Sequence, residues 1–388
     1  MQAQQLNQEA KILLDLVARK TTSLADHVME LDVSEYANPG QFKRECLELF
    51  RNHAQFVGAS SLLPNPGDYY AFDDTGIPII VARKADGSLG AYVNACSHRG
   101  APLGDGMGQA NKKRLLSCPY HGWAYDLDGK LIGVPFGDEG FAGMDRETRG
   151  LRPLDVQEKH GMIFVMPNPE LNFDIDEILA GIGPQFSGFG LDNHHFLGVK
   201  RVETAISWKL NMDTFHEFYH FDTLHPETIA LTAYNNVCHY QQFGRNHFMS
   251  SPSRQIHDLE QQSEAQWQPR EHMSFVSYIF PNTVIFVVGD HFQTWRVYPV
   301  DQQHSVVYHS MYVPKAAQTE EEEAEYQAYF QMINDVAVTE DYALVEKMQR
   351  GVNAGIERTM MIGRNEPGVQ NMHRQINDLL SPPTAVQL

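Results

Sequence analysis

The chain has 388 residues, of which 42% are hydrophobic and 11% aromatic, so it is long enough for two or three domains with a substantial core. Its 49 Asp and Glu residues outnumber 30 Lys and Arg residues, which gives a formal net charge of -19 at pH 7. This excess of negative charge argues against binding to nucleic acid or to an anionic membrane surface, because both would repel the protein.

Cysteine content indicates the redox compartment. Only four cysteines occur, at positions 46, 96, 118 and 238, and their spacing suggests no disulfide framework, so we expect a cytoplasmic protein. The polar N-terminal run lacks the apolar core of a signal peptide. No apolar stretch approaches the roughly 20 residues that cross a bilayer, so we expect no membrane association.

The first 50 residues carry two helical patterns. Apolar residues recur at helical spacing from Ala10 to about Leu31, and a second such pattern follows Pro39 to Phe50. We predict packing helices in this segment.

From about Phe56 the pattern changes to short runs rich in Val, Ile and Tyr, separated by Asp-Gly and Pro-Gly pairs. Residues 77–83 and 89–94 flank one Asp-Gly turn, and residues 123–126 and 131–132 flank another, which predicts two β-hairpins. We therefore expect a small antiparallel β domain over residues 51–166.

Two loops of this β domain each offer one thiol and one imidazole. The first carries Cys96 and His98, the second carries Cys118 and His121, and nineteen residues separate the two motifs. Two Cys and two His at these spacings could hold a structural zinc ion. However, C-x-H paired with C-x-x-H is typical of a Rieske [2Fe-2S] cluster, in which thiolates hold one iron and imidazoles hold the other. Glycines just after both histidines permit the tight turns that such a cluster needs.

A second concentration of polar residues is the run from Trp208 to His225, which holds three histidines and three carboxylates. His220 and His225 could each offer an imidazole nitrogen to a metal, and a distant carboxylate would complete the facial triad typical of non-haem Fe(II). The other interpretation is a half-buried amphipathic helix whose histidines are only hydrogen-bonded. On an unbroken helix the two side chains would point about 140° apart, so we predict that the helix bends or loosens between them.

The remaining sequence alternates strand and helix patterns. Aromatic and β-branched runs at 273–288, 291–298 and 306–313 predict an antiparallel sheet. Residues 320–342 predict a long helix that begins with an acidic run, which is favourable at a helix N-terminus. The aromatic-rich segment 231–256 is expected to form a flexible lid over a substrate pocket.

Taken together, the two motifs resemble those of the oxygenase component, or alpha subunit, of the Rieske-type non-haem iron oxygenases of the aromatic-ring-hydroxylating family. The resemblance covers nearly all of the chain and includes the motif N-W-K-x-x-x-[D/E]-N-x-x-[D/E]-x-Y-H-x-x-x-x-H. The chain departs from that motif at Ser207 and Thr214, where Asn is common, and at Glu217, where Asp is usual. The nineteen-residue spacer is also slightly long. None of these departures removes a metal ligand.

The resemblance implies an α+β fold, with a small all-β Rieske domain at 51–166 and a catalytic domain at 167–388. The catalytic domain would combine helices with an antiparallel sheet in the START-like, helix-grip arrangement, and residues 1–50 would pack on it. Asp335, Glu340 and Asp341 are candidates for the iron carboxylate, and the family segment T-E-D-x-x-x-x-E-x-x-Q-x-G selects Asp341. The implied cluster ligands are Cys96, His98, Cys118 and His121, and the implied ligands of the mononuclear iron are His220, His225 and Asp341.

Glu217 is the implied catalytic bridge, since the family places a carboxylate there between an iron histidine and a Rieske histidine of a neighbouring subunit. That role implies a homotrimer with head-to-tail contacts. His216 occupies a position that the motif leaves open and is expected to pack rather than bind metal. Asp213 and Asp222 are candidates only for supporting roles around the iron.

Electrons would come from NAD(P)H through a separate reductase or ferredoxin, because the chain has no nucleotide-binding glycine motif. Arg99 and the basic run Lys112-Lys113-Arg114 could dock that acidic partner, or could simply be a solvated hairpin tip. We expect O2-dependent mono- or dioxygenation of an organic, aromatic substrate. Oxidative demethylation and quaternary-amine monooxygenation are alternatives within the family, and a Rieske electron carrier is the alternative from another class.

Overall fold

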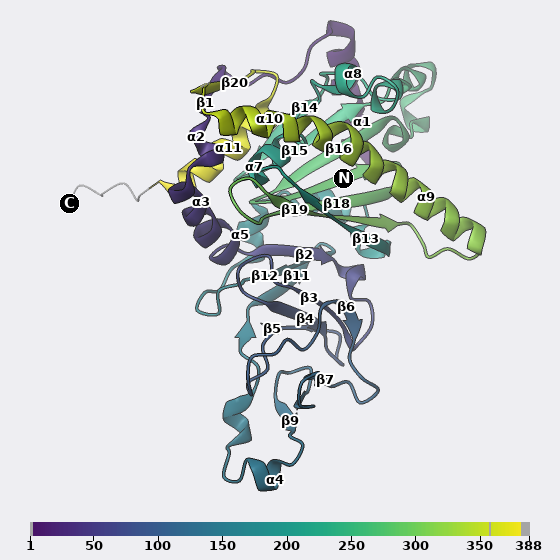
Figure 1. Ribbon diagram of the computed structural model, residues 1–388. Helices are drawn as coiled ribbons and strands as arrows, with labels where there is room; N and C mark the ends of the chain where they lie inside the picture. Colours follow the sequence, from purple (N-terminus) through teal and green to yellow (C-terminus); the bar gives the residue numbers. More distant parts are fainter. Residues whose placement is uncertain (1–2, 357, 382–388) are drawn as a thin grey trace, which may run out of the picture. The chain divides into compact units, whose positions relative to one another are not determined.

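A computed structural model describes residues 3–356 and 358–381 and divides the chain into two compact units (Figure 1). One unit combines the described residues up to Glu45 with those from Leu179 onward, and the other runs from Cys46 to Ile178. The N-terminal helices therefore belong to the same unit as the C-terminal half of the chain.

The smaller unit extends past the expected end at residue 166. The side chain of Asp155 accepts a hydrogen bond from the backbone N–H of Phe173 (3.1 Å), and Gln157 accepts one from Ile175 (3.1 Å). These bonds tie the segment after Pro167-Asn168-Pro169 to strand β11, Val156–Lys159, so the linker is not free. These bonds hold residues 173–175 within the smaller unit, which runs to Ile178.

Antiparallel β-strands form the smaller unit, as expected, in sheets of order β10-β5-β4-β3-β6, β11-β12-β2 and β7-β8-β9. Both predicted hairpins are present, as β4–β5 and β8–β9. The Asp-Gly turn of the second hairpin needs its glycine, because Gly129 has φ 78° and an added Cβ would lie 2.5 Å from the Tyr92 ring. The strand bounds are β2 Gln55–Ala59, β3 Asp68–Phe72, β4 Ile79–Arg83, β5 Leu89–Val93, β6 Gly106–Gln109, β7 Leu116–Ser117, β8 Ala124–Tyr125, β9 Leu131–Gly133, β10 Pro153–Leu154 and β12 Met162–Val165. The π-helix η1 spans Cys46–Arg51, and the short helix α4 spans Gly137–Gly140.

A seven-stranded antiparallel sheet of order β13-β19-β18-β17-β16-β15-β14 organises the larger unit. The expected lid at 231–256 is wrong for residues 239–252, which form β14, β15 and the tight turn between them within the sheet. All residues of β15 are buried, so the aromatic and apolar side chains of this segment supply core rather than a mobile cover. The strand bounds are β13 His195–Thr204, β14 His239–Phe243, β15 Asn246–Pro252, β16 Met273–Ile279, β17 Thr283–Val288, β18 His291–Pro299 and β19 Ser305–Val313.

Helices α1, α7, α9 and α11 contact strands of this sheet. The helix bounds of the larger unit are α1 Ala3–Arg19, α2 Ser34–Ala37, α3 Pro39–Glu45, α6 Gly183–Ser187, α7 Trp208–Asp213, α8 Phe221–Leu224, α9 Glu320–Val336, α10 Ala343–Ala354 and α11 Pro367–Leu380, and the short helix α5, Ile175–Leu179, begins in the smaller unit. The helix expected at 10–31 stops at Arg19 instead. Residues 29–32 form strand β1, which pairs with β20, Thr359–Ile362. The helix ends where Lys20 has a positive φ of 52°, and the Thr22 hydroxyl then accepts the backbone N–H of Cys238 (3.0 Å).

One face of the sheet is covered by both α7 and α9. Trp295 of β18 and His309 of β19 are direct ladder partners and stack with ring centroids 3.5 Å apart. Trp295 also contacts Phe215, just after α7 (5.2 Å), and His309 contacts Phe330 of α9 (4.8 Å). The sequence segments that follow α7 and α9 therefore leave from the same face of the sheet.

Candidate active site

The two Cys/His loops are built alike. Each cysteine begins a loop that closes with a backbone hydrogen bond four residues on, from Gly100 N–H to Cys96 (2.8 Å) and from Gly122 N–H to Cys118 (3.0 Å). Both glycines have positive φ, 78° and 72°, which other residues rarely adopt. The glycines expected from the sequence to permit tight turns therefore close both loops.

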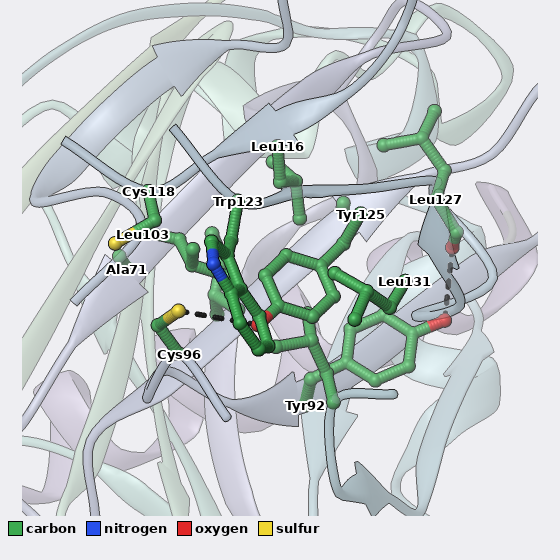
Figure 2. Packing of buried hydrophobic residues seen from close by; sticks show 13 residues of the cluster. Ala71, Tyr92, Cys96, Leu103, Leu116, Cys118, Trp123, Tyr125, Leu127 and Leu131 are labelled. Carbon is green, nitrogen blue, oxygen red and sulfur yellow. Dashed lines mark hydrogen bonds between the residues drawn. The ribbon is translucent and has the colours of Figure 1, made fainter. Parts of the chain in front are cut away.

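The thiols lie inside and the imidazoles outside. Cys96 and Cys118 are buried in the core of the β unit, with their sulfur atoms facing the same space (Figure 2). Burial raises the pKa of the Cys96 thiol. His98 is half-buried and His121 is exposed, and their Nδ1 atoms lie 3.1 Å apart. Two buried sulfurs and two outward-facing imidazoles could hold a cluster whose histidine edge faces the surface.

Ligand convergence distinguishes this set from a zinc site. A tetrahedral zinc ion would draw all four ligand atoms to within about 4 Å of one another. Among the residues that the structure describes, the only group of three or more His, Cys, Asp or Glu residues with ligand atoms within 4.8 Å of one another lies elsewhere. Cys96, His98, Cys118 and His121 thus fit two metal ions bridged to one another better than a single ion.

Tyr125 is a cluster neighbour that the sequence analysis did not single out. Its hydroxyl lies 3.2 Å from Cys96 Sγ and accepts the backbone N–H of Ser97 (3.0 Å). A thiolate bound to iron can only accept, so the Tyr125 hydroxyl would donate to it. Hydrogen bonds to cluster sulfur raise the reduction potential.

We therefore expect Tyr125→Phe to lower the cluster potential. One lost hydrogen bond of about 1 kcal/mol corresponds to about 40 mV for a one-electron couple. Redox titration of the visible absorbance measures the change. Tyr92→Phe is the matched control, because that hydroxyl lies in the same core but donates to the Leu127 carbonyl (2.9 Å, Figure 2). Equal potentials in both variants would contradict the assignment.

The second site lies where the chain leaves the sheet face covered by α7 and α9. The run from Trp208 to His225 is not one helix, as predicted: α7 ends at Asp213, and α8 is a single turn. His220 stands at the start of that turn and His225 at its end, where the backbone is no longer helical. This interruption lets both imidazoles turn to the same side.

His220, His225 and Asp341 come together at one point. Asp341 Oδ1 lies 3.5 Å from His220 Nε2 and 3.3 Å from His225 Nε2. His225 is fully buried, yet its Nε2 atom makes no hydrogen bond. A buried imidazole nitrogen without a partner, beside a carboxylate oxygen and a second imidazole, fits a metal ion.

Asp341 comes from η9, a π-helical segment spanning Ala337–Tyr342 between α9 and α10. Such wide turns inside a helix are frequent at functional sites. Helix α9, which precedes η9, begins as expected, since Thr319 caps it and four glutamates fill its first turn. Of the other carboxylate candidates, Asp335 is exposed and accepts a hydrogen bond from Gln331 (2.6 Å), so it lies outside the site.

The outer nitrogen of each histidine contacts a carboxylate. His220 Nδ1 contacts Glu217 Oε1, and the other Glu217 oxygen accepts the backbone N–H of Tyr219. Glu217 lies in the irregular backbone between α7 and α8. His225 Nδ1 lies 2.5 Å from Glu340 Oε2, which also accepts the Thr228 hydroxyl (2.8 Å). Carboxylates in this position orient the ring and raise the basicity of the ligating nitrogen.

From the sequence alone, Glu340 was a candidate ligand beside Asp341, and its contact with His225 was not predicted. We expect Glu340→Gln to weaken Fe(II) binding roughly 10–100-fold, because a neutral amide polarises the His225 ring less. Titration of the metal-free protein with Fe(II) measures the loss. Glu323→Gln, on the exposed first turn of α9, is the control, and affinity unchanged in both variants would exclude the role.

The remaining polar residues of the run lie outside the ligand set. His216 is fully buried against His247 and Tyr278, and burial lowers its pKa to about 3, so it packs as expected. Asp222 is exposed and pairs with Arg254 (3.2 Å).

The described helices include none with the length and apolar content of a membrane span.

A site of two histidines and one carboxylate on a helix-covered sheet, in one chain with a Cys2His2 β unit, defines a non-haem iron oxygenase supplied with electrons by a Rieske cluster. Comparison with known families agrees. Residues 53–144 match the Rieske [2Fe-2S] domain, and residues 191–382 match the ring hydroxylating alpha subunit (catalytic domain). The chain belongs to the Rieske-type non-haem iron oxygenases, and its cofactors are a [2Fe-2S] cluster and a mononuclear iron.

Individual relatives are similar over most of the chain. The glycine betaine monooxygenase oxygenase subunit of Chromohalobacter salexigens is 28% identical over 82% of this chain and 78% of its own length. The carnitine monooxygenase oxygenase subunit of Escherichia coli K12 is 27% identical over 87% of this chain and 90% of its own length. The anthranilate 1,2-dioxygenase large subunit of Burkholderia cepacia is 32% identical over 49% and 46%.

Among solved structures, the quaternary ammonium Rieske monooxygenase CntA in complex with L-carnitine superposes with a TM-score of 0.77 at 21% identity. The match covers 92% of this chain and 97% of that one. The fold expected from the sequence, an all-β Rieske domain and a catalytic domain of helices and antiparallel sheet, is thereby confirmed.

Proposed function

We propose that the protein is the oxygenase component of a multicomponent system that monooxygenates a quaternary ammonium compound. The convergence of His220, His225 and Asp341 carries the oxygenase assignment. In this proposal they hold the mononuclear iron, while Cys96, His98, Cys118 and His121 hold the cluster.

Three observations support the substrate class over the arene expected at first. Relatives similar over most of the chain are named for glycine betaine and carnitine, both quaternary amines. Glu217 in place of the usual Asp also resembles the quaternary-amine branch of the family. In addition, Phe215 and Trp295 place aromatic rings beside the segment that leads to His220, and aromatic faces attract cationic groups.

Bound iron would activate O2, and the cluster would supply electrons one at a time from a reductase that oxidises NAD(P)H. Insertion of one oxygen atom consumes one O2, two electrons and two protons, and yields the hydroxylated carbon and one water. The protein's own part is to hold the ligands, to orient their rings through Glu217 and Glu340, and to keep the site enclosed.

Glu217 is proposed as the bridge for electron transfer. It orients the His220 ring through Nδ1 and is itself held by the Tyr219 N–H. Its side chain is 13% exposed, which leaves an edge that a second imidazole could reach. If that imidazole is His98 or His121 of another subunit, the assembly is a ring, most simply a homotrimer.

Dioxygenation of an aromatic acid is the second candidate, favoured by the 32% identity to the anthranilate dioxygenase subunit. Substrate-dependent O2 consumption with ¹⁸O₂, in the presence of NADH and a reductase, separates the two. Quaternary amines should gain one labelled oxygen and arenes none. Formation of a doubly labelled arene diol would overturn the substrate class. If neither substrate class stimulated O2 uptake, the result would point to a simple electron carrier.

A further inference from the structure

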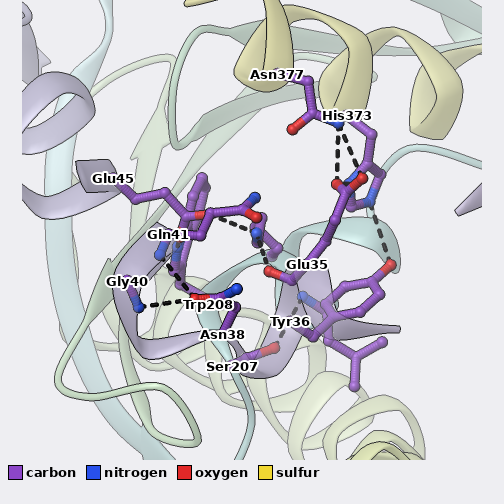
Figure 3. A network of polar contacts seen from close by, with 12 residues as sticks. Glu35, Tyr36, Asn38, Gly40, Gln41, Glu45, Ser207, Trp208, His373 and Asn377 are labelled. Atoms are coloured by element: carbon purple, nitrogen blue, oxygen red, sulfur yellow. Dashed lines mark hydrogen bonds and ion pairs between the residues drawn. The ribbon is translucent and has the colours of Figure 1, made fainter. Parts of the chain in front are cut away.

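A buried charged network joins three segments of the chain around α7. Figure 3 shows Glu35 and Tyr36 of α2, Glu45 at the end of α3, Trp208 of α7, and His373 and Asn377 of α11. Lys209 and Asp213 of α7 complete the network. Lys209 pairs with Glu45 (2.5 Å), and both side chains are 2% exposed. Buried charges are tolerated only when paired, so this network has a defined geometry.

His373 lies at the centre of the network and is completely buried. Its Nε2 atom is 2.9 Å from Asp213 Oδ1, and its Nδ1 atom is 3.7 Å from Glu35 Oε2. Tyr36 donates its hydroxyl to Asp213 (2.6 Å) and lies 3.2 Å from the same imidazole. Burial alone lowers the pKa of His373, but the Asp213 and Glu35 carboxylates outweigh it and raise the pKa to about 9.

Two further titratable groups, Lys209 and His216, lie near the His373 imidazole. Lys209 lowers the pKa of His373 and is itself paired with Glu45. His216, whose pKa His373 also lowers, stays neutral. Below pH 9 the Asp213 carboxylate therefore faces an imidazolium.

Asp213 is the last residue of α7, and the chain beyond it leads directly to Glu217 and His220. Residues 214–219 belong to no helix or strand, so their position depends on what holds the ends of the segment. Helix α11 contacts the N-terminal part of this segment at two places. His373 pairs with Asp213, and an added Cβ at Gly368 would lie 2.5 Å from the His216 carbonyl oxygen, so the helix backbone packs directly on the segment.

We propose that His373 is a positioning residue for the mononuclear iron: its imidazolium holds Asp213 and so fixes the segment that carries Glu217 and His220. The inference rests on the proposed iron site. His373 touches neither substrate nor metal and acts through Asp213, with Gly368 as the second contact of the same helix.

The test follows release of Fe(II) from the full-length protein to a ferrous chelator between pH 6 and pH 10, with cluster absorbance recorded in parallel. In the wild type, release should accelerate as pH rises through about 9. Release accelerates with rising pH because the pKa of His373 is higher in the folded protein than in the unfolded chain. The stabilisation by the imidazolium is therefore complete below about pH 6.5 and is lost above the folded pKa of about 9. His373→Gln should release iron roughly 10–100-fold faster at pH 7 and lose the alkaline acceleration.

Matched variants separate this role from general loss of packing. His194→Gln also removes an imidazole at 9% exposure, one that lies between two backbone carbonyls, and should release iron at the wild-type rate. Gly368→Ala should speed release but keep the pH dependence, because it displaces the segment without removing the charge. Should His373→Gln not fold, Asp213→Asn, which removes the partner charge, must abolish the alkaline acceleration instead.

Wild-type release and wild-type pH dependence in His373→Gln or Asp213→Asn would overturn the proposal. The His225→Ala variant distinguishes this outcome from failure of the proposed iron site. If the iron site is wrong, His225→Ala still contains chelatable iron. If only the role of His373 is wrong, His225→Ala has lost that iron.

Discussion

Glu217→Gln is expected to leave both metal sites filled and to reduce turnover at least about 100-fold, the scale of an essential proton-coupling group. The carboxylate orients His220 through Nδ1, and in the proposed ring it also receives the N–H of a cluster histidine from the next subunit. A neutral amide can still fill the space, so the fold should persist, and saturating Fe(II) keeps the iron site filled even though the His220 ring has lost its carboxylate. Two measurements are needed, iron per chain and the rate at which the reduced cluster is reoxidised with substrate and O2.

Glu227→Gln is the control for this experiment, because Glu227 is an exposed glutamate of the same segment. Its turnover should match that of the wild type. Normal reoxidation and turnover in a fully metallated Glu217→Gln protein would remove the bridging role.

His225→Ala should lose the mononuclear iron while keeping the cluster. The variant removes one of three ligands and also leaves the Glu340 carboxylate without its imidazole partner. Metal content should fall from about three irons per chain to about two, with unchanged visible absorbance and no substrate oxidation.

His257→Ala serves as the comparison, since His257 is exposed and pairs only with Glu260 (2.7 Å). It should keep all of its iron. A His225→Ala protein that retained three irons and its activity would show that the mononuclear metal lies elsewhere.

Sequence spacing alone singled out the two Cys/His loops, because the residues of each loop are close in sequence. Cys96 and His98 belong to one loop, and the backbone bond from Gly100 to Cys96 is set by local residue types. Asp341 needed the family motif, because nothing local distinguishes it from Asp335. Only the fold shows that Asp335 faces solvent while Asp341 faces two histidines.

Side-chain pairs between distant segments could not be predicted. Glu340 meets His225 across 115 residues through a π-helical turn that no pattern in the sequence marks. Residues 239–252 were predicted as part of a lid because their aromatic and polar mixture suits an exposed loop as well as a buried strand. Their true state depends on neighbouring strand β16, which pairs with β15.

Elemental analysis of the purified protein, combined with its visible spectrum, tests most directly whether one chain holds both kinds of iron. We expect about three irons and two acid-labile sulfides per chain, a coloured protein and no zinc. A colourless preparation that contained zinc in place of iron would contradict the assignment of both sites.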